Sequence, residues 1–62
     1  MIHSEMSAPT LALYLRRIGL ARSVPALAAL AHEIERRYRG DEATPRLLAV
    51  IALRVKRLAG AN

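Results

Sequence analysis

The side chains that could carry out acid–base or metal chemistry are few and are spread along the sequence. His32 and Glu33 begin the pattern His-Glu-x-x-His, which binds zinc when two histidines lie one helical turn apart. Arg36 stands where that pattern needs its second histidine, and its positive charge would repel a metal ion. Glu33 and Glu35 are two residues apart, so on a helix they point in different directions and cannot share a proton or a substrate. We therefore expect no metal site and no catalytic pair of carboxylates.

Two other kinds of site need residues that the chain lacks. The sequence contains no cysteine, so it offers neither a thiolate ligand for a metal nor a disulfide bond. Its three glycines are scattered and do not form the glycine-rich loop that holds a phosphate group. We therefore expect a protein that is not an enzyme and that binds no cofactor.

An excess of basic residues is the strongest chemical signal in the sequence. The chain has ten lysine and arginine residues against five acidic residues, which gives a formal net charge of +5. From residue 43 onward there is no acidic residue, and the basic ones are Arg46, Arg54, Lys56 and Arg57. Such a segment attracts acidic proteins and phosphates alike. We predict that these four side chains contact an acidic protein partner or, alternatively, the phosphates of a nucleic acid.

The nucleic-acid alternative has no recognisable motif behind it. With Gly19 as the turn of a helix-turn-helix, Pro25 falls inside the helix that would read the bases. Side chains that read adenine are scarce, because Asn62 is the only asparagine and glutamine is absent. Tyr14 and Tyr38 are the only aromatic residues, and both fall on predicted core faces, where they could not stack on bases. We therefore rank nucleic acid second to an acidic protein.

Three helices must position these side chains. Each of the three prolines stands two residues before a leucine that opens a helical pattern of apolar residues. Proline suits the first turn of a helix, where its missing N–H costs nothing. The sequence therefore predicts helices at about 9–18, 24–39 and 45–59, in one helical domain over 8–62 behind a flexible tail at 1–7.

Small polar residues and glycines mark where these helices start and end. Ser23 and Thr44 are the predicted N-caps of the second and third helices. Gly40 is expected to end the second helix. Gly19 is expected to end the first in the left-handed conformation, although a helix that continues through it is also possible.

The apolar residues of the predicted helices exceed what one small core can hold. A chain of this length buries only about 60% of the surface that it exposes when unfolded. Leu11, Tyr14, Leu15 and Ile18 share one face of the first helix, which leaves Leu13 outside it. In the third helix, Val50 and Leu53 also fall outside the apolar arc. We predict that two or more copies share a core through Leu13, Val50 and Leu53.

Together these patterns predict a small all-α protein-interaction module. We expect it to form a homodimer or larger homo-oligomer and to act as an adaptor or regulator of an acidic protein partner; the alternative is a nucleic-acid-binding regulator that uses the basic third helix. No membrane span is expected, because the uncharged run Leu47 to Leu53 is far shorter than the roughly 20 residues that span a bilayer. A membrane-surface partner is not expected either, because the charges of the third helix are spread among Val50 and Leu53 and the chain has no tryptophan or phenylalanine to anchor it. The first residues lack the features of a secretory signal, so we expect a cytoplasmic protein.

Overall fold

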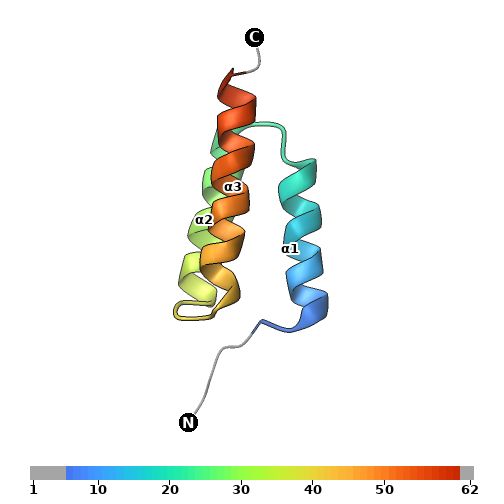
Figure 1. The fold of residues 1–62 in the computed structure, drawn as a ribbon, viewed down its shortest axis with the longest axis vertical. Coiled ribbons are helices and arrows are strands. Elements are labelled where there is room, and N and C mark those ends of the chain that lie inside the picture. Colours follow the sequence, from blue (N-terminus) through green and yellow to red (C-terminus); the bar gives the residue numbers. More distant parts are fainter. Residues whose placement is uncertain (1–5, 61–62) are drawn as a thin grey trace.

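Three α-helices make up the fold. The computed structural model describes residues 6–60, which contain α1 (Ala8–Leu20), α2 (Val24–Arg37) and α3 (Ala43–Gly60). The predicted all-α class is confirmed, no strand occurs within 6–60, and each helix end lies within two residues of its predicted position. The chain runs up α1, down α2 and up α3, so α1 and α3 point the same way (Figure 1). Of the predicted tail, residues 1–5 lie outside the described part.

Serine side chains start the first two helices. The Ser7 hydroxyl accepts the backbone N–H of Thr10 at 3.3 Å, and the Ser23 hydroxyl accepts that of Ala26 at 3.2 Å. In both helices a proline follows within the first turn, where it leaves no backbone donor unpaired. The sequence signals of serine and proline therefore act together, as predicted for Ser23.

The start of α3 differs from the prediction. The helix begins at Ala43, so Thr44 lies inside it and is not its N-cap. The Asp41 carboxylate accepts the backbone N–H of Ala43 at 2.8 Å, while the buried Thr44 hydroxyl donates to the Tyr38 carbonyl at 2.5 Å. Thr44 therefore ties the end of α2 to the start of α3, and Asp41 satisfies a free N–H of the first turn.

The two glycines behave differently. Gly40, in the link between α2 and α3, has a φ of 85°, which residues with a side chain rarely adopt. Gly19 stays helical inside α1, and the extended residue Ala21 caps the helix after its last residue, Leu20. The prediction that Gly19 ends the helix in a left-handed conformation was wrong. The last carbonyls of α1 find donors without a left-handed turn: the Ala21 backbone N–H donates to the carbonyls of Arg17 and Ile18, and a side chain of α3 donates to later ones, as described below.

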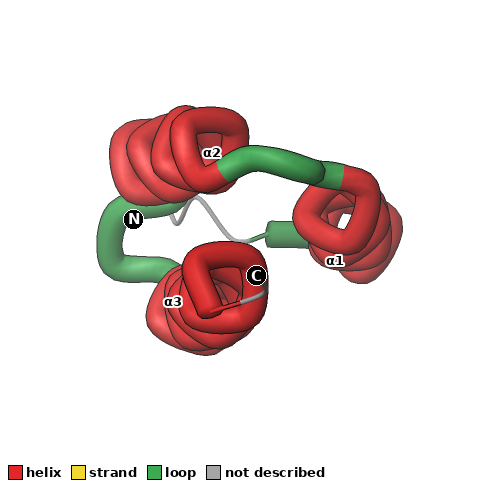
Figure 2. The backbone as a smooth tube through the Cα atoms, turned by 90° about the horizontal axis from the view of Figure 1, so that it is seen from above, coloured by secondary structure: helices red, strands yellow, loops and turns green. Residues whose placement is uncertain are grey.

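The core lies where the three helices meet. Seen along the helix axes, they stand at the corners of a triangle (Figure 2). α3 packs against both α1 and α2. The buried apolar residues are Tyr14, Ile18, Leu27, Leu30, Ile34, Leu47 and Ile51. Of the core face predicted for the first helix, Tyr14 and Ile18 are buried, Leu11 is half-buried and Leu15 is 43% exposed. None of the helices within 6–60 combines the length and the apolarity needed to cross a membrane.

Candidate functional site

An apolar groove runs between α1 and α3. Leu15 from α1 and Val50 and Leu53 from α3 line it, beside Ile18 and Gly19. Leu15, Val50 and Leu53 are 43%, 39% and 56% exposed, so each still presents a large part of its side chain to solvent. Three aliphatic side chains from two helices at one place form a continuous apolar surface, which is more informative than scattered exposed residues.

The spacing of α3 explains why this surface exists. Arg46, Val50, Leu53 and Arg57 stand at positions i, i+4, i+7 and i+11, so they fall within about 60° of one another around the helix. We call these four residues the α3 stripe. Leu47 directly follows Arg46 in the sequence, and Ile51 directly follows Val50, so both lie about 100° around the helix from the stripe residue before them. Both are buried in the core. One face of α3 therefore builds the core, while the stripe beside it stays open.

The structure does not bring Leu13 to this groove. Leu13 is 55% exposed and lies about 200° around α1 from Leu15, on the side of the helix that also carries the exposed Leu20. Of the three residues predicted for self-association, Val50 and Leu53 therefore lie together in the groove, whereas Leu13 lies on another side of α1. Leu15 takes its place in the groove. The sequence pattern assigned Leu15 to the core, because only the packing of α1 on α3 shows that it is left at the edge.

Arg54 is held by the end of α1. Its Nη2 atom donates to the carbonyl oxygens of Gly19 at 3.3 Å and of Ala21 at 3.2 Å. These carbonyls lie at the C-terminal end of a helix, where the helix dipole favours a positive charge. The Arg54 side chain therefore completes the end of α1, and its guanidinium is already engaged within the fold.

The other three basic residues of α3 lie in two places. Arg46 and Arg57 are exposed at the two ends of the α3 stripe, and Arg57 also borders the apolar groove. Lys56 is exposed about 100° around the helix from Arg57. Neither Arg46 nor Arg57 forms a salt bridge with another residue in the range 6–60. The α3 stripe is thus apolar at its centre and carries an exposed arginine at each end, and of these two only Arg57 lines the groove.

A second polar cluster joins α1 to α2. The Tyr14 hydroxyl donates to Oε2 of Glu33 at 2.7 Å, and the same oxygen lies 3.3 Å from Arg17 and 3.6 Å from Arg37. The Arg17 guanidinium also lies 5.6 Å from the centre of the Tyr14 ring. Helical spacing puts Glu33 and Arg37 one turn apart on α2, but it cannot show the tyrosine that α1 brings to the same carboxylate.

The surroundings of this cluster shift the pKa values of Tyr14 and Glu33 in opposite directions. Burial raises the pKa of Tyr14, and its hydrogen bond to Glu33 raises that pKa further. The hydrogen bond from Tyr14 lowers the pKa of Glu33, and the nearby Arg17 lowers it further. Near neutral pH the tyrosine is therefore held protonated and the glutamate ionised. Such an arrangement stabilises the contact between two helices.

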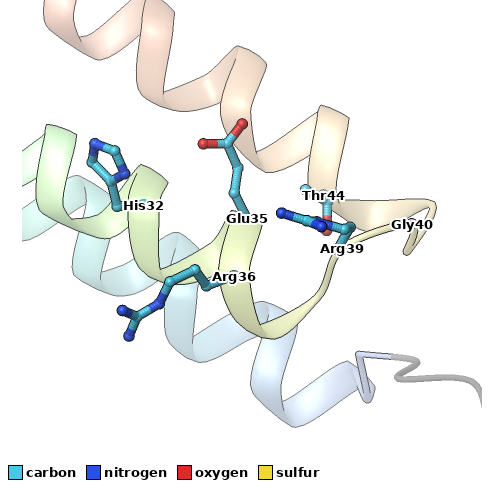
Figure 3. A pocket seen from close by; sticks show the side chains of 6 residues that line it. All are labelled: His32, Glu35, Arg36, Arg39, Gly40 and Thr44. Carbon is cyan, nitrogen blue, oxygen red and sulfur yellow. The ribbon is translucent and has the colours of Figure 1, made fainter.

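A shallow hollow beside α2 brings His32 close to Glu35, Arg36, Arg39, Gly40 and Thr44. The Glu35 and Arg36 side chains point to opposite sides of the helix (Figure 3). Thr44 is not available as a nucleophile, because its hydroxyl donates to a backbone carbonyl. Within 6–60, no three histidine, cysteine or acidic side chains lie close enough to share a metal ion. The groove between α1 and α3 is therefore the stronger candidate for a binding site.

No family model, curated protein or solved structure matches this chain. The case for a function accordingly rests on the geometry and charge of the α1–α3 groove.

Proposed function

We propose that this chain is a non-catalytic helical interaction module, an adaptor or regulator that docks a helix of another polypeptide across the α1–α3 groove. The observation that carries the proposal is the meeting of Leu15, Val50 and Leu53 in one exposed apolar surface. An amphipathic helix lays its apolar face into a groove of this kind and contributes side chains at helical spacing. α1 and α3 run in the same direction (Figure 1), and side chains of both helices line the groove.

The size of the apolar surface indicates what else the interaction needs. Each of the three side chains is about half exposed, so burying the rest contributes roughly 1 kcal/mol apiece. The loss of translational and rotational freedom on association costs about 4 kcal/mol or more. The apolar centre would therefore give only weak binding by itself. Further contact along the helices and the two arginines of the α3 stripe must add to it.

Self-association is one form of this function. It is supported by the small core of the chain and by the aliphatic side chains that stay exposed on both α1 and α3. The charges of the stripe act against it. If two α3 helices packed antiparallel about a two-fold axis, Arg46 of one copy would lie near Arg57 of the second copy, and like charges would repel. A homodimer of this type should therefore be strengthened by salt, which screens the repulsion.

Nucleic-acid binding by the basic third helix finds less support. Arg54 is engaged with α1, and Lys56 lies on another side of α3 from the stripe. Tyr14 is buried and Tyr38 is half-buried, so neither offers a flat surface for base stacking. The remaining exposed arginines are separated by aliphatic residues, which gain little from contact with a phosphate backbone.

Chemical-shift mapping on the isotope-labelled protein tests the docking function. The protein is followed in a series of its own concentrations, and again with a neutral amphipathic peptide that carries leucines at i, i+4 and i+7. We expect shifts at Leu15, Val50 and Leu53 in at least one series, and we expect Leu53→Glu to abolish them because it places a charge in an apolar contact. Ala52→Glu is the control, since Ala52 is exposed on α3 away from the stripe. Unchanged signals along the groove in both series would disprove the docking function.

A further inference from the structure

We propose that the helix docked in the α1–α3 groove is an acidic amphipathic helix of a different protein, whose carboxylates pair with Arg46 and Arg57. This inference rests on the docking function proposed above and names the chemistry of the partner. Its basis is charge complementarity along the α3 stripe, which has an apolar centre between two exposed arginines.

The spacing of the stripe defines the partner. Arg46 and Arg57 are eleven residues apart in sequence, which places them about 16 Å apart along the helix. A docked helix that follows the stripe must carry acidic residues about three turns apart, with aliphatic residues between them. The two arginines are not equivalent. Arg46 borders a hollow that Asp41 and Glu42 also line, whereas Arg57 borders the apolar groove, where no acidic residue within 6–60 lies. Arg57 should therefore contribute more to the choice of partner.

A second copy of the chain fits this surface poorly. Among the acidic residues within 6–60, Glu33 is engaged with Tyr14 and two arginines, and the Asp41 carboxylate accepts backbone N–H groups of Met6 and Ala43. Glu35 lies on the solvent face of α2, and Glu42 lies in the link between α2 and α3. None of them borders an apolar helix face with the spacing of the stripe. A second copy therefore offers arginines where carboxylates are needed.

Two helical peptides test the inference directly. The acidic peptide carries glutamates at i and i+11 and leucines at i+4 and i+7, and the neutral peptide carries glutamines in place of both glutamates. Binding is measured by fluorescence anisotropy at low and at high salt. Two exposed ion pairs should make the acidic peptide bind roughly 2- to 30-fold more tightly at low salt, and this advantage should shrink at high salt.

Charge-neutralising variants locate the effect. Arg57→Gln should remove most of the preference for the acidic peptide, and Arg46→Gln should remove a smaller part. Lys56→Gln removes the same charge from an exposed position outside the stripe, so it should leave the preference unchanged. An equal loss in the Lys56 and Arg57 variants would mean that net charge alone is responsible, and it would overturn the inference.

The remaining outcomes separate this inference from the docking function. If both peptides bind equally and Leu53→Glu abolishes binding, the docking function stands and the acidic partner is disproved. If neither peptide binds and the protein also stays monomeric, both are disproved. If a DNA duplex, or vesicles of phosphatidylserine and phosphatidylcholine, displace the acidic peptide in an Arg57-dependent way, the face binds phosphates and the inference is wrong. A homodimer that the acidic peptide cannot dissociate would assign the groove to a second copy.

Discussion

Removing the hydroxyl group of Tyr14 should destabilise the fold in a way that depends on pH. Tyr14→Phe keeps the ring in the core and deletes only the hydroxyl that donates to Glu33 at 2.7 Å. A hydrogen bond to a charged group contributes about 1.5–3 kcal/mol. The Glu33 side chain is 29% exposed and keeps Arg17 and Arg37 as partners, so the lower part of that range applies. We expect a loss of about 1–2 kcal/mol in the free energy of unfolding at pH 7.

The two pKa shifts fix the sign of the pH dependence. The folded state lowers the pKa of Glu33, so its contribution is present above the ordinary value of 4.5 and is lost as the pH falls through the folded value. The folded state raises the pKa of Tyr14, so its contribution is present below the ordinary value of 10.0 and is lost as the pH rises through the folded value. The difference between the wild-type protein and Tyr14→Phe should therefore be largest between these limits.

Urea unfolding followed by circular dichroism measures this difference at about pH 3, 7 and above 10. The thermal midpoint at pH 7 should fall by roughly 8–15 °C, given the size of the domain. Tyr38→Phe is a matched control. Tyr38 packs edge-to-face on Tyr14 with ring centres 6.1 Å apart, and its hydroxyl makes no hydrogen bond to another residue within 6–60. If both variants lose the same stability at pH 7, or if the Tyr14 effect is constant with pH, the Tyr14–Glu33 interaction does not stabilise the folded protein.

Two further predictions concern the ends of helices. Gly19→Ala should stabilise the protein by about 0.5–1 kcal/mol, because position 19 is helical and has open space around it. Gly40→Ala should destabilise it by about 1–2 kcal/mol, because position 40 has a positive φ. Urea unfolding that ranks the two variants the other way would contradict this. Arg54→Met should cost about 1–2 kcal/mol by leaving the carbonyls of Gly19 and Ala21 without their donor, whereas Lys56→Met should change stability by less than about 0.5 kcal/mol. Equal thermal midpoints for these two methionine variants would show that Arg54 does not complete the end of α1.

The helices themselves could be predicted because their signals are local. Ser23 and Pro25 act on the backbone within four residues, and the apolar period of α2 depends on sequence alone. Even the choice between a continuous and an interrupted first helix was visible at Gly19. One contact of that helix end is not local, because Arg54 donates to the Gly19 carbonyl from 35 residues away in sequence.

The binding surface could be predicted only in part, for the same reason. Val50 and Leu53 were correctly placed outside the core because both belong to one helix with a regular period. Leu15 was assigned to the core, since its exposure depends on how closely α1 approaches α3. The hydrogen bond between Tyr14 and Glu33 was not predicted, since a helical pattern cannot show a tyrosine on a neighbouring helix. The arrangement of two helices determines each of these positions.

The central place of α3 has a consequence for how the chain folds during synthesis. α1 and α2 leave the ribosome first, and their apolar side chains have only each other to cover them until the last third of the chain emerges. α3 then supplies packing for both helices at once and brings Arg54 to the end of α1. A nascent chain stalled in the α2–α3 link should therefore remain a target for chaperones, and it should acquire protease resistance only after α3 is released.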